Sequence, residues 1–316
     1  MVIQMLKKIS IRKITLSTIA LLAISLLYLM PESKKISPKE ELEYTNANVT
    51  TSPIYLLDKN NYLAKVDVVT SKTNAKEKAQ ELIKIMTIDA MESKIPNGFN
   101  AILPPNTEVL NISIEGDLLK IDFSKDILDI DEKKEEKMVE AICYTLTEIE
   151  NINKIIIYVE GDILTKLPKT KINLPSTLDK TFGINKEFDL TSTKDIKDVT
   201  IYYINQIKGN YYYVPVTKYL NDNREKIDII IDELSQNFNP NKNLMSFLSA
   251  NAKLVSAKQN GQTLNLEFNE ELFDDKVTET VLDEVIQSVS LSAKENYDIN
   301  EVVFTVNSKE VAKKAL

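Results

Sequence analysis

An internal repeat constrains the fold of this 316-residue chain more than any other feature of the sequence. The segment Asn106–Leu128, "NTEVLNISIEGDLLKIDFSKDIL", aligns without gaps with Asn251–Phe273, "NAKLVSAKQNGQTLNLEFNEELF", which begins 145 positions later. The similarity extends to both sides, because "NAKEKAQELIKIM" from Asn74 resembles "DNREKIDIIIDEL" from Asp222, and "INKIIIYV" from Ile152 resembles "INEVVFTV" from Ile299. The repeat indicates two similar folded units in tandem. Identical residues stand at Asn106/Asn251, Gly116/Gly261, Leu119/Leu264 and Phe123/Phe268.

The hydrophobic pattern inside one unit predicts strands mixed with helices. Each unit also carries a helix-capping pattern, in which Asn74 precedes Glu77 by three residues and Asp222 precedes Glu225 in the same way. This mixture predicts an α+β fold of two tandem two-layer sandwich units, each with a mainly antiparallel sheet and helices on one face. The expected strands are Ile54–Leu57, Leu63–Val69, Val109–Ile114, Leu118–Phe123 and Lys154–Val159, and the expected helices are Ala75–Ile88 and Glu135–Glu148.

The N-terminus carries a hydrophobic span. Residues 14–30, "ITLSTIALLAISLLYLM", hold no charge, and residues 1–13 before them carry basic residues and no acid. This arrangement predicts an uncleaved transmembrane signal anchor, with residues 1–13 as a cytoplasmic tail and the rest of the chain outside the cell membrane. A secretory signal peptide is the alternative. We expect residues 31–51 to be a tether, 52–161 the first domain, 162–197 a linker and 198–316 the second domain.

The composition excludes several classes of function. The chain has no His, a single Cys and six Gly, with no glycine-rich phosphate loop. The commonest general base and the commonest nitrogen ligand for metals are therefore missing, and no internal disulfide can form. The net charge of −8 argues against nucleic acid as a partner. The acidic segment 126–136 lacks the glycine and spacing of a calcium-binding loop. We expect no catalytic residue, no cofactor and no metal.

Two stretches of the first unit resemble the GerM domain family. These are "LPPNTEVLNISIEGDLLKIDFSKDI" from Leu103 and "ICYTLTEIENINKIIIYVEG" from Ile142, which contains the Tyr144–Glu148 block "YTLTE" and ends in Glu160-Gly161. In the second unit, Val289–Ser292 replaces Tyr144–Thr147 and Asn307-Ser308 replaces Glu160-Gly161. The resemblance covers about residues 51–316.

The resemblance implies a non-enzymatic cell-envelope protein, with a fold similar to the ring-building motif of sporulation-channel and secretion-ring proteins. It implies a part in assembling the channel complex between mother cell and forespore, or in spore germination. Tandem members of the family are typically lipoproteins. This chain departs from them, because it has no Cys near the span to receive a lipid.

The segment Ala141–Gly161 combines a thiol, hydroxyls and carboxylates. Cys143 lacks a His partner and lies next to the apolar stripe of the expected helix, so we expect a buried, unreactive thiol. Thr145, Thr147 and Glu148 are expected to form the last turn of that helix, with hydroxyls bonded back to carbonyls or serving as local caps. Tyr144 lies off the stripe and is expected at a sheet edge or an interface.

The two units share one pair of carboxylates, Asp122 and Asp126 in the first and Glu267 and Glu271 in the second. General acid–base catalysis needs two carboxylates in different environments within a cleft. Asp122 alternates with the apolar Ile121 and Phe123, so we expect it on a solvated face.

The densest aromatic cluster is "YYYVPV", Tyr211–Val216. Pro215 cannot donate to a neighbouring strand, so this strand is expected at an edge of the sheet or to be bulged. Exposed aromatic residues on an edge suit partner recognition, and we expect Tyr211 and Tyr213, together with Tyr144, to form an interaction surface.

Together these features predict a non-enzymatic, membrane-anchored extracytoplasmic scaffold. Its expected partners are envelope or sporulation-channel proteins, further copies of the chain, and the membrane itself through residues 14–30. One alternative is a cell-wall enzyme or its accessory, acting on glycan through Asp122 and Glu267. Another is an extracytoplasmic sensor of a small ligand, which needs an apolar cavity between the units.

Overall fold

The computed structural model describes residues 18, 21–22, 50–236 and 243–316. The predicted tail 1–13 and almost all of the predicted span 14–30 and tether 31–51 lie outside these residues. Within the described residues, no helix is long and apolar enough to cross a membrane. The internal repeat lies in one compact unit, Val49–Leu316.

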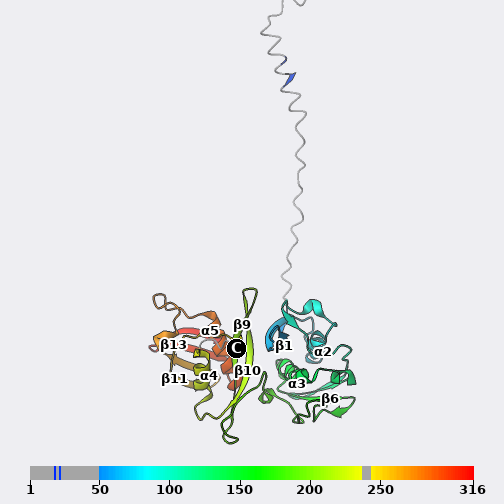
Figure 1. Ribbon diagram of the computed structural model, residues 1–316. Helices are drawn as coiled ribbons and strands as arrows, with labels where there is room; N and C mark the ends of the chain where they lie inside the picture. The colour runs from blue at the N-terminus through cyan, green and yellow to red at the C-terminus, as the bar shows by residue number, and fades with distance from the viewer. Residues whose placement is uncertain (1–17, 19–20, 23–49, 237–242) are drawn as a thin grey trace, which may run out of the picture. The chain divides into compact units, whose positions relative to one another are not determined.

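The strands and helices of the first repeat lie close to the bounds that the sequence predicts, and Figure 1 shows how they are arranged. The predicted helix after Asn74 is confirmed, since the Asn74 side chain accepts hydrogen bonds from the backbone N–H groups of Lys76 and Glu77. The bounds are β1 Thr51–Asp58, β2 Leu63–Val69, α2 Ala75–Met86, η2 Glu92–Lys94, β3 Phe99–Asn100, β4 Val109–Glu115, β5 Leu118–Phe123, η3 Lys125–Leu128, α3 Glu132–Leu146 and β6 Lys154–Val159.

The second repeat has equivalents of most of these elements, and its first helix begins differently. The capping pattern at Asp222 is wrong as a prediction: Asp222 instead accepts from the backbone and side chain of Arg224, and the helix begins at Lys226. The connection between the repeats holds β7 Asp162–Ile163, η4 Lys180–Phe182 and β8 Glu187–Asp189. The bounds in the second repeat are β9 Lys197–Ile207, β10 Asn210–Leu220, α4 Lys226–Ser235, β11 Leu254–Asn260, β12 Thr263–Phe268, η5 Glu270–Leu272, α5 Asp283–Asn296, β13 Glu301–Val306 and β14 Lys309–Ala315.

Each repeat contributes a sheet of its own, in the order β4-β5-β6-β7 in the first repeat and β11-β12-β13-β14 in the second. Their central pairs, β5 with β6 and β12 with β13, are parallel, and the outer pairs are antiparallel. The helices α3 and α5 provide the crossover that a parallel pair requires. The α+β class is confirmed, and each of these sheets is mainly antiparallel, with two antiparallel pairs and one parallel pair.

The first hairpins of the two repeats join in a third sheet, in the order β3-β1-β2-β10-β8, with β9 paired to β10. Tyr213 on β10 lies opposite Lys65 on β2, so this sheet runs across the boundary between the repeats. The repeats are therefore not two self-contained sandwiches. The expectation that Tyr211–Val216 forms an edge strand is wrong, because β10 lies between β9 on one side and β2 and β8 on the other.

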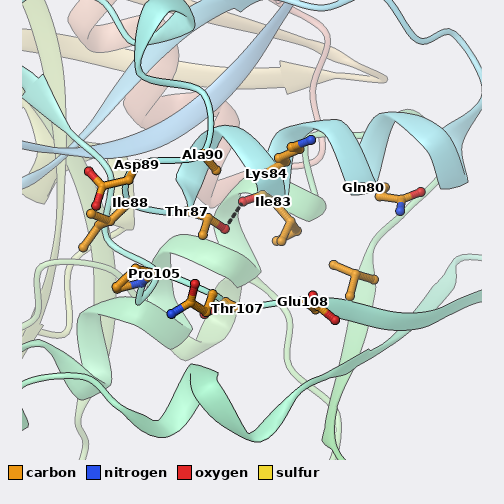
Figure 2. A pocket seen from close by; sticks show the side chains of 12 residues that line it. Gln80, Ile83, Lys84, Thr87, Ile88, Asp89, Ala90, Pro105, Thr107 and Glu108 are labelled. Carbon is orange, nitrogen blue, oxygen red and sulfur yellow. Dashed lines mark hydrogen bonds between the residues drawn. The ribbon is translucent and has the colours of Figure 1, made fainter.

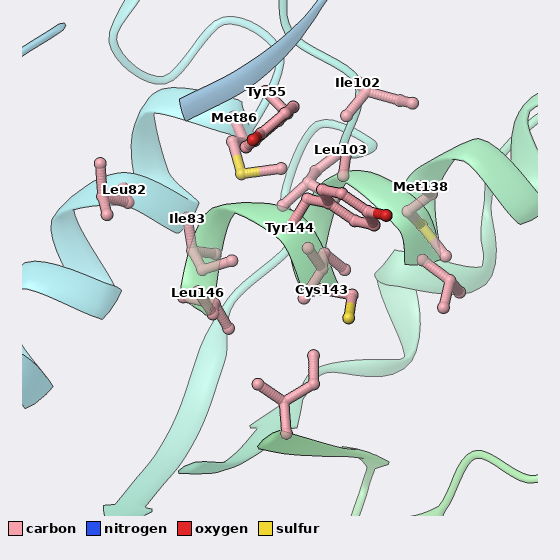
Figure 3. Close-up of a cluster of buried hydrophobic side chains, with 14 of the residues drawn as sticks. Tyr55, Leu82, Ile83, Met86, Ile102, Leu103, Met138, Cys143, Tyr144 and Leu146 are labelled. Atoms are coloured by element: carbon pink, nitrogen blue, oxygen red, sulfur yellow. The ribbon is translucent and has the colours of Figure 1, made fainter. Parts of the chain in front are cut away.

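Each repeat has its own core. In the first, side chains from α2, α3 and β1 pack together with the sheet, including Tyr55, Ile83 and Tyr144 (Figure 3). The segment 162–197 packs on this same core through Leu167, Leu174, Leu178 and Ile184, whose side chains are buried. The connection between the repeats is thus an ordered part of the first repeat's structure.

Candidate functional site at the junction of the repeats

The ends of α3 and α5 hold the hairpin of their own repeat by the same hydrogen bond. The hydroxyl of Thr145 accepts from the backbone N–H of Tyr55 (3.0 Å), and the hydroxyl of Ser292 accepts from that of Tyr202 (2.8 Å). Both pairs are 90 residues apart in sequence. These bonds fix β1 on α3 and β9 on α5 in the same register.

The two tyrosines so positioned meet across the junction. The hydroxyls of Tyr55 and Tyr202 share a hydrogen bond of 2.9 Å, and both rings are fully buried. Each hydroxyl also lies 3.2 Å from a carboxylate of its own repeat, Glu148 for Tyr55 and Glu295 for Tyr202. Burial beside these carboxylates raises the pKa of both phenols well above the usual value, so both remain protonated donors.

Lys180, from η4, links the two carboxylates. Its ammonium lies 2.8 Å from Glu148 and 3.3 Å from Glu295, and Lys65 on β2 adds a second ion pair with Glu148 at 3.0 Å. The carboxylate side chains are 12% and 4% exposed. We call Tyr55, Lys65, Glu148, Lys180, Tyr202 and Glu295 the joint cluster.

The ionisation of the joint cluster follows from these contacts. Burial alone raises the pKa of Glu148, but the ammonium groups of Lys180 and Lys65 outweigh it and lower that pKa to about 2. Burial lowers the pKa of Lys180, and the two carboxylates reverse this and raise it above its ordinary value. Glu148 and Lys180 are therefore charged and paired at neutral pH.

These contacts correct the alignment of the two repeats at their ends. Thr145 corresponds to Ser292 and Glu148 to Glu295, so the block Tyr144–Glu148 aligns with Leu291–Glu295 and not with Val289–Ser292. Tyr55 and Tyr202 are 147 residues apart, the same spacing as Ile152 and Ile299. Extending the repeat at this spacing could have revealed the joint cluster from sequence.

The hydroxyls and the thiol of the "YTLTE" region have different roles. The Thr147 hydroxyl donates back to the Cys143 carbonyl (2.7 Å), as expected. Cys143 is fully buried and its burial raises the pKa of the thiol, which fits the predicted unreactive residue. Thr145 and Glu148 are not local caps, since both bind residues about ninety positions away. The hydrogen bonds of both side chains are to residues far away in sequence, which a local pattern does not predict.

Tyr144 is part of the junction rather than of an external surface. Its side chain is fully buried, its hydroxyl donates to the Lys180 carbonyl (2.9 Å), and its ring packs edge-on against Tyr55 with centroids 5.4 Å apart. It therefore lies at an interface, but at one inside the chain.

A second polar contact joins the repeats where Pro215 removes a strand donor. The side-chain amide of Asn185 donates to the carbonyls of Leu63 (2.8 Å) and Pro215 (2.7 Å), and its oxygen accepts from the Leu63 N–H (2.9 Å). The Asn185 backbone N–H in turn donates to Glu140 (2.9 Å). Asn185 thus bridges β2 and β10 in place of strand pairing. Sequence reasoning missed it because its partners lie 30 and 122 residues away.

The repeated carboxylates stabilise turns. Asp122 accepts from the backbone N–H of Gly161 (3.1 Å), and Glu267 accepts from the equivalent N–H of Ser308 (2.9 Å). Glu271 forms an exposed ion pair with Lys276 at 2.5 Å. The contacts of Asp122 and Glu267 are those of a hydrogen-bonded turn in both repeats.

Tyr211 and Tyr213 differ in accessibility. Tyr211 is 42% exposed, and its ring packs edge-on against Phe247 with centroids 5.1 Å apart. Tyr213 is half-buried, and burial raises its pKa to about 12. Tyr211 remains available to a partner, from the face of an interior strand.

A hollow of about 570 Å³ lies between the C-terminal half of α2 and the segment 105–109 (Figure 2). Ile83 and Thr87 line one side of it, and Pro105 and Glu108 line the other. The Thr87 hydroxyl donates to the Ile83 carbonyl (2.9 Å). This hollow is lined wholly from the first repeat, whereas the ligand-sensor alternative requires a cavity between the repeats. Within the described residues, no cluster of three or more Cys, Asp or Glu side chains could hold a metal ion.

The chain is similar in sequence to a known family and to a known protein. The model of the Germane family, described as "Sporulation and spore germination", matches residues 53–165 and 200–312. The chain belongs to the Germane family. The predicted GerM relationship is therefore confirmed, in two tandem copies. The spore germination protein GerM of Bacillus subtilis (strain 168) is 33% identical over 268 residues, covering 81% of this chain and 71% of that protein.

The fold also has a solved counterpart. The tandem GerMN domains of the sporulation protein GerM from Bacillus subtilis superpose with a TM-score of 0.75 at 29% identity. The match covers 83% of this Germane chain and 92% of the solved one. The solved protein therefore has the same two-repeat architecture as this chain.

Proposed function

We propose that this Germane chain is a non-enzymatic scaffold that acts in sporulation and spore germination. The name of its relative, the spore germination protein GerM, and the family description, "Sporulation and spore germination", support the part of the proposal that concerns sporulation and germination. The observation that carries the scaffold role is the joint cluster. The tyrosines, carboxylates and lysines that two repeats could have offered to a substrate are instead buried against each other, where they hold the repeats as one body.

The contacts at the junction support a fixed relation between the repeats. The Asn185 amide and the pairing of Tyr213 with Lys65 add backbone bridges to the ion pairs. A two-repeat body joined by buried polar groups that bind one another presents its outer surfaces at fixed positions. Fixed surfaces suit a component that sets the spacing of its partners.

We place the scaffold on the outer side of the cell membrane, anchored by residues 14–30. The support is the uncharged span with its basic N-terminal flank. Envelope proteins, including further copies of the chain, are the partners in this proposal. Tyr211, exposed on β10, is the aromatic residue through which contact is proposed.

Photo-crosslinking in cells tests the scaffold role. A photoreactive phenylalanine derivative in place of Tyr211 should yield adducts with defined envelope proteins. The same derivative in place of Val277, which is 93% exposed on the second repeat, controls for non-specific capture. Adducts that are identical from both positions would contradict the role of Tyr211. Hydrolysis of cell-wall glycan by the purified chain, abolished by Asp122→Asn with Glu267→Gln, would contradict the non-enzymatic role.

A further inference from the structure

The outward face of the first repeat's own sheet holds a hollow of about 280 Å³. Three strands form it: β4 contributes Asn111 and Ser113, β5 contributes Lys120 and Asp122, and β6 contributes Tyr158. The strand register brings these side chains together, since Asn111 lies opposite Asp122, Ser113 opposite Lys120, and Asp122 opposite Tyr158. Gly161 completes the lining.

The second repeat presents the same strand positions with different chemistry. Ser256 lies opposite Glu267, and Glu267 lies opposite Thr305, which takes the place of Tyr158. There the residue that replaces Tyr158 is engaged, because the Thr305 hydroxyl donates to the Glu267 carboxylate, and the Asn265 amide donates to the Lys258 carbonyl (3.3 Å). Thr305 and Glu267 of the second repeat are thus bonded to each other.

The face of the first repeat is open by comparison. Within the described residues, the side chains of Asn111, Ser113 and Tyr158 form no hydrogen bond, and Asp122 uses one oxygen on the Gly161 N–H. Lys120 pairs with Glu115 at 2.8 Å. The hollow therefore offers hydrogen-bond donors and acceptors, and its lining carries one ammonium, that of Lys120, and one carboxylate, that of Asp122.

We propose that this hollow binds a neutral pyranose ring of a polysaccharide. A sugar ring has hydroxyls that both donate and accept, which matches the amide, hydroxyl and carboxylate around the hollow, and an apolar C–H face that matches the ring of Tyr158. A shallow site on a sheet leaves room for a chain to continue in both directions. The lining carries one cation, Lys120, and one anion, Asp122, so its charges cancel and favour a neutral ligand over an anion or a cation. The site binds and does not cleave, since Asp122 is tied to the Gly161 turn.

Isothermal titration of the full chain with the tetramer of N-acetylglucosamine, in a detergent without sugar headgroups, tests the site. We expect saturable binding to one site. Tyr158→Thr, which copies the second repeat, should weaken it by about tenfold or more, whereas Tyr158→Phe, which keeps the ring, should weaken it by about threefold or less. Thr305→Ser is the matched control on the second repeat and should leave the affinity unchanged.

Thermal unfolding of each variant separates loss of binding from loss of fold, and Tyr158→Thr should keep the unfolding temperature within a few degrees. Three results would overturn the proposal: no saturable binding of the tetramer by the parent chain, equal affinity in Tyr158→Thr and the parent, or preferential binding of an anionic polymer such as polyglutamate.

Discussion

The hydroxyls of Tyr55 and Tyr202 share a hydrogen bond across the junction of the repeats, and the two residues occupy the same position in their respective repeats, 147 residues apart. Each is held by the hydroxyl at the end of its own helix and by the carboxylate three residues later, Thr145 with Glu148 and Ser292 with Glu295. The repeats therefore meet through equivalent residues, as two subunits meet at a twofold axis. The lysines break this symmetry, because among the residues that the structure describes Glu148 pairs with both Lys65 and Lys180, whereas Glu295 pairs with Lys180 alone.

Replacing Lys180 should destabilise the chain more than replacing a lysine with exposed partners. Lys180→Met leaves Glu295, 4% exposed, without a cation, and we expect a loss of about 2 kcal/mol in the free energy of unfolding. Lys226→Met is the matched control, since Lys226 is equally exposed (30%) but pairs with Asp198, which is 46% exposed; its cost should stay below about 1 kcal/mol. Urea unfolding measures both.

A compensating variant sharpens the test of Lys180. Adding Glu295→Gln to Lys180→Met removes the unpaired charge and should recover part of the lost free energy. Equal losses for Lys180→Met and Lys226→Met would show that the joint cluster does not stabilise the fold.

The hydroxyl of Thr145 should stabilise the fold because its oxygen accepts a hydrogen bond from the Tyr55 N–H. Thr145→Val keeps the shape of the side chain but leaves the buried Tyr55 N–H without a partner, at an expected cost of about 1–3 kcal/mol. Thr145→Ser keeps the oxygen that Ser292 supplies in the second repeat, and should cost less than about 1 kcal/mol. Hydrogen exchange at the Tyr55 amide gives a local measure, with protection lost in the valine variant and kept in the serine variant. Retained protection in Thr145→Val would contradict the assigned role.

The sequence predicted most elements and much less of the junction. Strands Leu63–Val69, Leu118–Phe123 and Lys154–Val159 were predicted at their observed bounds, because their apolar pattern is a local property. The roles of Thr145 and Glu148 depend on residues about ninety positions away, so a local pattern assigned them to helix capping. Pro215 predicted an edge or bulged strand, but β10 lies inside the sheet. Pro215 has no N–H to donate, and the Asn185 side chain bridges β2 and β10 instead. Contacts between residues far apart in sequence decided both cases, within the first repeat for Thr145 and Glu148 and between the repeats for Pro215.

The stability of the chain should depend on pH through Glu140. Its carboxyl is buried, and burial raises its pKa from 4.5 to about 7 despite Lys186 at 3.7 Å, the Asn185 N–H and nearby Lys137, with Glu136 also raising it. Because the folded-state pKa is above the unfolded value, the protonated carboxyl favours folding. This contribution is complete below about pH 4.5 and is lost as the pH rises through 7.

Glu140→Gln removes this titration and retains an oxygen for the Asn185 N–H. We expect the variant to match the parent below pH 4.5 and to exceed its free energy of unfolding at pH 8 by about 1–3 kcal/mol. Denaturant unfolding at pH 4, 6 and 8 measures the difference. The same loss of stability between pH 5 and 8 in parent and variant would exclude Glu140 as its source.

Asn185 should be the residue whose side chain contributes most to the bridge between β2 and β10. Asn185→Gly removes the amide and leaves the Leu63 N–H and the carbonyls of Leu63 and Pro215 unpaired, at an expected cost of about 2–4 kcal/mol. Asn185→Ala should cost about 1 kcal/mol more, because the backbone φ of 47° is left-handed and glycine adopts it without strain.

Asn151→Gly is the control for Asn185→Gly. Asn151 is exposed and also has a left-handed φ of 65°, so the change should alter stability by less than about 0.5 kcal/mol. Hydrogen exchange at the Leu63 amide should rise in both Asn185 variants and stay unchanged in Asn151→Gly. If Asn185→Gly proves as stable as the parent, with the Leu63 amide still protected, then the strands β2 and β10 are held together without the Asn185 amide.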